Sequence, residues 1–105
     1  MTGALPPAGD PGGADHTGVT PPTVTVRFWA AARAAAGVEG ESVTGATLAD
    51  VLDVVHANHP ERRFADVISI CSIVVGDRPV GARDPAEIQM APGDTVEFLP
   101  PFAGG

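Results

Sequence analysis

The chain ends in Gly104-Gly105, and the last residue carries the free carboxylate. A carboxylate reacts as an electrophile only after its oxygen becomes a good leaving group, and no side chain crowds this one. Glycine has no Cβ, so it fits a narrow channel and accepts backbone angles that other residues refuse. The preceding Pro100-Pro101 fixes φ and favours an extended backbone, which would hold the end away from the domain. We therefore expect a terminus that a partner enzyme can activate.

An ordinary frayed tail is the competing interpretation of these last residues. A tail that follows a strand usually carries charges, whereas Phe102-Ala103-Gly104-Gly105 has no charged side chain. This lack of charge favours a tail that threads into a partner over one that is only solvated.

Few other side chains offer chemistry. Cys71 is the single cysteine, which excludes an internal disulfide and a cysteine-rich metal or iron–sulfur site. It lies in an apolar run, so we expect a buried and unreactive thiol. His56 and His59 are three residues apart near a helix end, but no third ligand accompanies them, and we predict no metal site.

The composition is that of one acidic domain of 105 residues, with a net charge of −7, six arginines and no lysine. This charge argues against binding to nucleic acid or to an anionic membrane, and it fits docking to a more basic protein. The chain has no apolar run of about 18 residues, and its start lacks the basic and apolar regions of a secretory signal. We therefore expect a cytoplasmic protein.

Three parts of the chain differ in composition. Residues 1–22 contain five glycines, five prolines and few large apolar residues, which predicts a disordered arm to which we assign no role. Residues 23–99 are expected to form the folded domain. Residues 100–105 are expected to form an extended tail that ends in Gly-Gly.

Five segments have the patterns of β-strands. In the first, Val24, Val26 and Phe28 alternate with polar residues, which is typical of a half-buried strand. The continuous apolar run over residues 68–75 predicts a central strand. Pro79 suits an edge strand because it cannot donate to the ladder. The expected strands are residues 23–29, 41–44, 68–75, 78–80 and 95–99.

One main helix is expected among these strands. Thr47 can cap its start, and Asp50 at the third helical position lies near the positive end of the helix dipole. The helix should end by His59, because Pro60 disfavours the α region in the residue before it. Its expected buried face comprises Leu48, Val51, Leu52 and Val55. Shorter helices are expected at residues 30–36 and 61–67.

The order strand, strand, helix, strand, short strand, strand predicts the fold. The first hairpin leads into a helix that packs across a mixed sheet, with the first and last strands as neighbours at the sheet centre. This is the β-grasp, or ubiquitin-like, arrangement of the α+β class.

Two stretches of the sequence resemble the molybdopterin synthase small subunit (MoaD), within the ubiquitin-like MoaD/ThiS family of sulfur carriers. They are residues 24–33 and residues 92–105, and the helix opening at Thr47 is similar too. The most specific part is the end motif, a Gly-Asp turn, an apolar strand, Pro-Pro, two more residues and Gly-Gly. The related thiamine carrier ThiS also ends in Gly-Gly, but it is shorter and usually lacks the Pro-Pro.

The resemblance implies a sulfur carrier that is not catalytic alone. An E1-like (MoeB-like) adenylyltransferase would use ATP to adenylate the Gly105 carboxylate, and sulfur from a persulfide donor protein would then give a C-terminal thiocarboxylate. The tail would insert into the large synthase subunit (MoaE-like), with which the carrier forms a sulfurtransferase. There it would donate sulfur to cyclic pyranopterin monophosphate for molybdenum cofactor biosynthesis. The resemblance implies no stably bound cofactor and no metal in the carrier.

The same resemblance assigns roles to single residues. Gly105 would bear the sulfur, and Gly104 would let the tail thread. Leu99 should be exposed beside the root of the tail, as the family's apolar contact to the large subunit, unless the arm or a loop covers it. Pro79 would extend that patch, and Arg33 would pair with a partner carboxylate or stay solvated. The residues expected to line the path of the tail are Pro100, Pro101, Phe102 and Ala103.

Three other functions stay open at this point. The first is a sulfur carrier for another product, such as thiamine or cysteine. The second is a ubiquitin-like modifier that is joined through Gly105 to a lysine of a substrate protein. The third is a plain β-grasp interaction module with an incidental tail.

Overall fold

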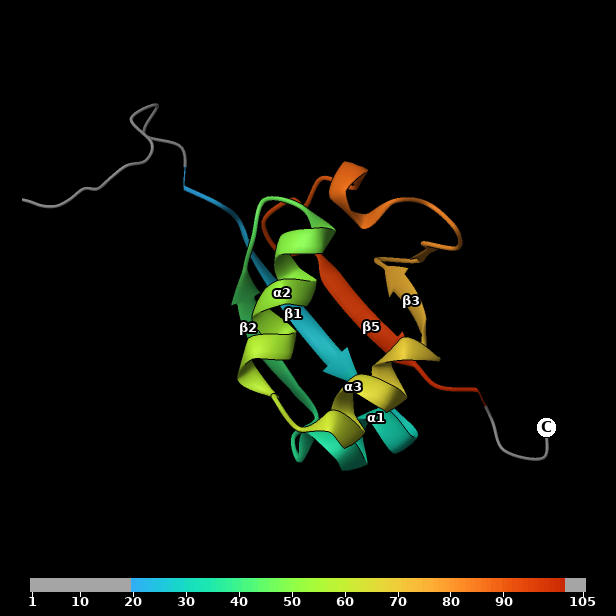
Figure 1. Cartoon of the computed structure of the whole chain (residues 1–105). Coiled ribbons are helices and arrows are strands. Elements are labelled where there is room, and N and C mark those ends of the chain that lie inside the picture. The colour runs from blue at the N-terminus through green and yellow to red at the C-terminus, as the bar shows by residue number, and fades with distance from the viewer. Residues whose placement is uncertain (1–19, 102–105) are drawn as a thin grey trace, which may run out of the picture.

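A computed structural model describes residues 20–101 of the chain (Figure 1). Most of the predicted arm and the last four residues of the predicted tail lie outside this range. The strands are β1 (Thr23–Phe28), β2 (Gly40–Thr44), β3 (Ser72–Val75), β4 (Arg78–Pro79) and β5 (Thr95–Leu99). The helices are α1 (Ala30–Ala36), α2 (Leu48–Asn58), α3 (Arg62–Ser69) and a short 3-10 helix, η1 (Pro85–Glu87).

The five strands form one mixed sheet in the order β2-β1-β5-β3-β4. The pair β1–β5 is parallel, and the other neighbouring pairs are antiparallel. The first and last strands therefore lie side by side at the centre, with α2 crossing one face of the sheet (Figure 1). This confirms the predicted α+β class and its β-grasp, ubiquitin-like arrangement.

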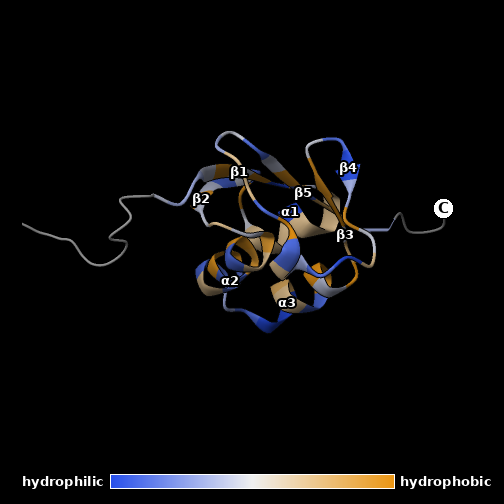
Figure 2. Cartoon of the chain, turned by 90° about the horizontal axis from the view of Figure 1, so that it is seen from above, coloured by the Kyte–Doolittle hydropathy of each residue, from blue (hydrophilic) through white to orange (hydrophobic). Residues whose placement is uncertain are grey.

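A single apolar core lies between the sheet and the helices. In β1, the alternate residues Val24, Val26 and Phe28 are buried, as their spacing predicts. In β5, Val96 and Phe98 have no exposed surface. Helices α2 and α3 lie together on this side of the sheet (Figure 2). They add Leu48, Val51, Val55, Phe64 and Ile68 to the core.

Helix α2 begins with the predicted cap. The side chain of Thr47 accepts a hydrogen bond from the Asp50 backbone N–H, and the Asp50 carboxylate accepts one from the Thr47 backbone N–H, each at 3.2 Å. Such a reciprocal pair satisfies two backbone donors that the first turn leaves without partners. The helix ends at Asn58, with His59 as its C-cap before Pro60, which also agrees with the prediction.

The prediction of a strand over residues 68–75 is wrong in its first half. Helix α3 continues to Ser69, and β3 begins only at Ser72. Phe64 and Ile68 are four residues apart on one helical face and are both buried, so Ile68 completes the helix instead of starting a strand. The strand itself has a neighbour on each side, β5 and β4, as a strand inside the sheet does.

The strand that contains Pro79 lies at the edge of the sheet, as predicted, and it is one residue shorter than predicted. Pro79 in β4 pairs with Val74 in β3, and among the strands of the described part of the chain β3 is the one neighbour of β4. Within residues 20–101, no helix combines the length and the apolar character that crossing a bilayer requires.

Candidate functional site

The end of β5 is the part of the fold that positions the predicted tail. On one side β5 pairs with β1, and on the other side it pairs with β3, up to the partners Leu99 and Ser72. The Trp29 backbone N–H also donates to the Phe98 carbonyl at 3.2 Å. Because both neighbours hold the strand and its inward side chains are buried, the backbone is fixed as far as Leu99.

The sheet ends at Leu99 because the next two residues are prolines. A proline has no backbone N–H, so Pro100 and Pro101 cannot continue the ladder toward either neighbour. Pro100 is buried and Pro101 is exposed, so the described chain passes from the body of the domain to its surface between them. Of this pair, Pro101 alone offers exposed surface to a partner. The predicted site residues Phe102, Ala103, Gly104 and Gly105 lie outside the described residues.

Leu99 lies on the open face of the sheet, but it is half-buried and not exposed as predicted. It points away from Phe98, as the alternation in β5 requires. Its burial follows from its place in the sheet, because neighbours on both sides shield a residue of a doubly paired strand. Leu99 therefore adds less exposed apolar surface beside the root of the tail than the sequence predicts.

The structure does place Leu99 and Pro79 on the same face. In the strand register Leu99 is opposite Ser72, and Pro79 is opposite Val74, so all four side chains belong to the open face. A hollow of about 280 Å³ adjoins this patch and is lined by residues of β3 and β4, among them Ser72 and Pro79. The predicted apolar patch beside the tail root thus includes Val74, which the sequence analysis did not assign to it.

Cys71 also lines this hollow, in the turn between α3 and β3. Its thiol is half-buried and donates to the Val67 carbonyl at 3.2 Å. Burial raises the pKa of the Cys71 thiol, which keeps it protonated and weakly nucleophilic near neutral pH.

Trp29 is a site residue that the sequence analysis missed. It follows β1, caps α1, and leaves 41% of its surface exposed next to the end of β5. The Arg27 guanidinium lies 5.3 Å from the centre of its ring, and the indole N–H donates to the Glu97 carboxylate at 3.2 Å. An exposed tryptophan that is held in place on one face is typical of a residue that anchors a partner.

A signal for Trp29 was present in the sequence. Side chains alternate between the two faces of β1, and Trp29 follows Thr25 and Arg27 in the series that faces away from the core. The alternation therefore predicts that its ring lies on the open face of the sheet. Ile70, with 62% of its surface exposed, was missed for a different reason, because it was assigned to a strand that does not exist there.

Arg33 lies close to this surface. It is exposed on α1, and its backbone N–H donates to the Trp29 carbonyl at 3.3 Å, one helical turn away. Its position therefore permits contact with a carboxylate of a protein that covers Trp29. Within residues 20–101, no group of three histidine, cysteine, aspartate or glutamate side chains has the arrangement of a metal site.

A comparison with protein families decides what kind of molecule this is. Residues 26–105 match the ThiS family, over a range that includes the second half of β1, all the later strands and the Gly-Gly end. The chain belongs to the ThiS family. It therefore has the ubiquitin-like fold of the ThiS/MoaD sulfur carriers and modifiers. No curated protein matches its sequence.

Solved structures with the same fold come from several kinds of carrier and modifier. The small archaeal modifier protein 1 (SAMP1) of Methanosarcina acetivorans is 22% identical, with a TM-score of 0.68 over 81% of this chain and 98% of its own. A second match is the complex of subunits 1 and 2 of the molybdopterin-converting factor of Helicobacter pylori. It gives 20% identity and a TM-score of 0.60, over 79% of this chain and 99% of the matched chain. The BexX/CysO complex of Amycolatopsis orientalis gives 27% identity and a TM-score of 0.64, over 78% of this chain and 99% of the matched chain. These similarities show the shared fold, and the names of the matched structures differ in kind, so the fold alone does not single out one function.

Proposed function

We propose that this chain is a sulfur carrier that bears a thiocarboxylate on Gly105. It donates the sulfur to cyclic pyranopterin monophosphate as the small subunit of molybdopterin synthase, in the biosynthesis of the molybdenum cofactor. The observation that carries this proposal is the path of β5. The strand is central, is paired on both sides, and leads from Leu99 directly into the Pro-Pro and Gly-Gly sequence.

Activation of the tail requires a separate enzyme. An E1-like adenylyltransferase uses ATP to convert the Gly105 carboxylate into an acyl adenylate, with release of pyrophosphate. The terminal sulfur of a persulfide then displaces AMP, and a thiol cleaves the resulting S–S bond to leave the thiocarboxylate. Its sulfur is anionic and soft at neutral pH, so it attacks carbon as a thiolate does.

Docking uses the surface around the root of the tail. Trp29 and the patch of Leu99, Val74 and Pro79 offer apolar contact, and Arg33 offers a charge to a partner carboxylate. The partner is a MoaE-like large subunit, and the complex of the two H. pylori subunits supports this choice for a neighbour of the same fold. The described domain holds the tail, and the partner supplies the acid, base and substrate pocket.

A second candidate is a carrier for a different pathway, such as thiamine or cysteine biosynthesis. The identity to CysO in the A. orientalis complex, 27%, exceeds the identity to the H. pylori subunits, 20%. A third candidate is a protein modifier, which the similarity to SAMP1 favours. All three use the same fold and differ in what receives the tail.

The deciding experiment is intact-mass analysis of the chain after co-expression with its activating enzyme and a large subunit. A carrier gains about 16 Da as sulfur replaces one oxygen, whereas a modifier appears as a heavier isopeptide conjugate. The loaded chain and the large subunit are then incubated with cyclic pyranopterin monophosphate. Formation of molybdopterin supports the proposal. Loading without conversion assigns the sulfur to another pathway, and conjugates assign the chain to the modifiers.

A variant extended by one alanine after Gly105 tests the position of the chemistry. It should fold normally and gain no sulfur, because its carboxylate is displaced and belongs to a residue with a Cβ. The matched control carries the same alanine before Met1 and should load as the unaltered chain does. Normal loading of the extended variant would contradict the mechanism.

A further inference from the structure

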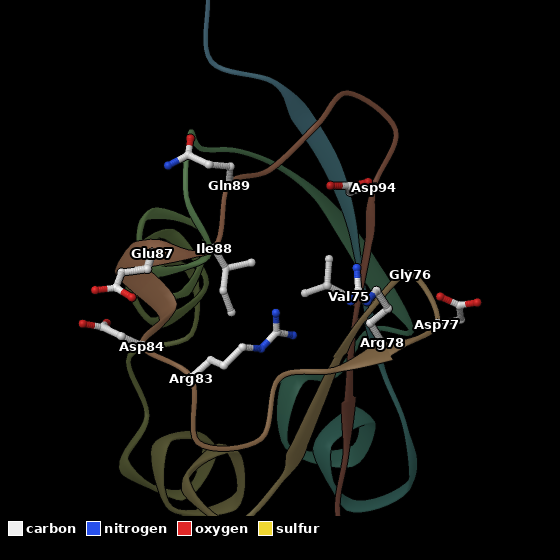
Figure 3. A pocket seen from close by; sticks show the side chains of 10 residues that line it. All are labelled: Val75, Gly76, Asp77, Arg78, Arg83, Asp84, Glu87, Ile88, Gln89 and Asp94. Atoms are coloured by element: carbon white, nitrogen blue, oxygen red, sulfur yellow. The ribbon is translucent and has the colours of Figure 1, made fainter.

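A second concave site lies at the opposite end of β5 from the tail. It is a pocket of about 600 Å³ beside Asp94, the residue that precedes β5, and it extends to the β3–β4 turn and to the segment around η1 (Figure 3). Leu99 lies at the other end of the same strand. The pocket is therefore outside the surface that we assign to the tail and its partner.

Two sides of the pocket each carry an apolar side chain. Val75 at the end of β3 and Ile88 after η1 face each other across the opening (Figure 3). Both are half-buried and pack against the core, so the domain itself fixes their positions. These two side chains can contact a short hydrocarbon group and remove it from water.

Two guanidinium groups point into the same space. Arg83 reaches between Ile88 and Val75, and Arg78 lies beside Val75 (Figure 3). Arg83 is held in place, since its Nε donates to the Val80 carbonyl at 3.2 Å and its Nη2 donates to the Pro79 carbonyl at 2.9 Å. An arginine has five N–H donors, so three of them stay available to a ligand.

Among the described residues, the carboxylates around the pocket form no direct ion pair with these arginines. Among residues 20–101, the one close contact between a basic and an acidic side chain joins His59 Nε2 and Glu41 Oε1 at 2.7 Å, and neither residue lines the pocket. The Asp84 carboxylate accepts a hydrogen bond from the Ala86 backbone N–H at 2.9 Å, and it points outward together with the side chains of Glu87 and Asp77 (Figure 3).

Asp94 is also engaged, because it accepts a hydrogen bond from the Ala91 backbone N–H at 2.8 Å. The space between Val75 and Ile88 therefore holds a guanidinium group, while three of the four lining carboxylates point away from it (Figure 3).

We propose that this pocket binds a small carboxylate that carries a short branched hydrocarbon group. A guanidinium binds a carboxylate through two parallel hydrogen bonds, and a pair of them selects an anion over a neutral group of the same shape. The hydrocarbon group contacts Val75 and Ile88. Two sources supply this chemistry, a free carboxylic acid or the C-terminal valine or leucine of a polypeptide, and the experiment distinguishes them.

The test is an NMR titration of the full chain labelled with ¹⁵N. Isovalerate is the free probe, N-acetylglycylvaline is the peptide probe, and isovaleramide is the neutral control of the same shape. The backbone amides of Gly76 and Gln89 should shift with either carboxylate and should not shift with the amide. Tighter binding of the peptide points to a polypeptide terminus as the source, and equal or tighter binding of isovalerate points to a free acid.

Arg78→Gln is the informative variant, because within residues 20–101 the Arg78 side chain makes no hydrogen bond like those of Arg83 to Val80 and Pro79. It should lower the affinity about tenfold or more, as expected for a lost hydrogen bond between charged groups. Arg62→Gln on α3 changes the net charge equally and should leave the affinity unchanged. Binding of isovaleramide as strong as that of isovalerate, equal losses in both variants, or no shift at saturating probe would overturn the proposal.

Discussion

The clearest test of the site compares two adjacent residues of β5, Leu99 and Phe98. Phe98 is completely buried and stacks on Phe28, with ring centres 5.7 Å apart. Truncation of such a side chain to alanine costs about 3–5 kcal/mol. In a domain of this size, each kcal/mol lowers the melting temperature by about 4–8 °C, so Phe98→Ala should lower it by more than about 12 °C.

Leu99→Ala should affect stability much less and binding much more. Complete burial of a leucine is worth about 1.5–3 kcal/mol, and Leu99 is only half-buried, so the variant should lose about 1 kcal/mol, or about 4–8 °C. A partner that covers the exposed half would bury a similar amount. Removal of the Leu99 side chain should therefore weaken binding to the large subunit about fivefold.

Differential scanning calorimetry and isothermal titration calorimetry measure the two effects separately. Thr95→Ala is the matched control, because Thr95 lies on the same open face at the other end of β5 and should leave the affinity unchanged. If Leu99→Ala destabilises the domain as much as Phe98→Ala, the assignment of faces in β5 is wrong. If it binds as tightly as the unaltered chain, the docking surface is wrong.

Three further predictions concern stability and reactivity. Thr47→Ala removes the cap of α2 and should cost about 1 kcal/mol, seen as a fall of about 4–8 °C in melting temperature. Gly40→Ala should cost about 1–3 kcal/mol in urea unfolding, because a Cβ there would collide with the Val26 carbonyl oxygen, whereas Ser42→Ala in the same strand should be nearly neutral. Burial raises the pKa of the Cys71 thiol, so the folded state keeps the thiol proton to higher pH than the unfolded chain does. The unfolded chain starts to lose this proton near the ordinary cysteine pKa of about 8.5, and the free energy of unfolding falls as the pH rises above that value. Cys71→Ala should therefore lose less stability than the unaltered chain between about pH 8 and about pH 10.

Local sequence patterns predicted the parts of the fold that a single pattern determines, such as the alternation of a strand or the cap of a helix. The parity of β1 and β5 identified their buried residues, and the Thr47–Asp50 pair identified the start of α2. The apolar run of residues 68–75 could not be divided in this way, because an apolar stretch of that length suits a helix end and a strand equally. The deciding contact is the packing of Ile68 beside Phe64 in the core, which depends on the tertiary structure.

The site was predictable where it follows from the strand, and not where it depends on distant contacts. The alternation in β5 placed Leu99 on the open face, but its partial burial comes from the neighbouring strands. The fixed orientation of Trp29 depends on Glu97, which is 68 residues away in the sequence. The pocket around Arg83 likewise forms only where the β3–β4 turn, the segment around η1 and the residue before β5 meet. No local sequence pattern in these segments predicts that contact.

The fixed end of β5 sets a condition on any partner that uses the tail. The strand is held on both sides up to Leu99, so contact with Trp29 and Leu99 also fixes where Pro101 leaves the domain. The four residues that follow Pro101 can span at most about 14 Å when fully extended. The partner's reactive centre must therefore lie within that distance of the surface that receives Trp29 and Leu99. A misplacement of about 1 Å at a reacting atom can already cost about 100-fold in rate. A rigid root is therefore what allows so short a tail to deliver its end to a site on another protein.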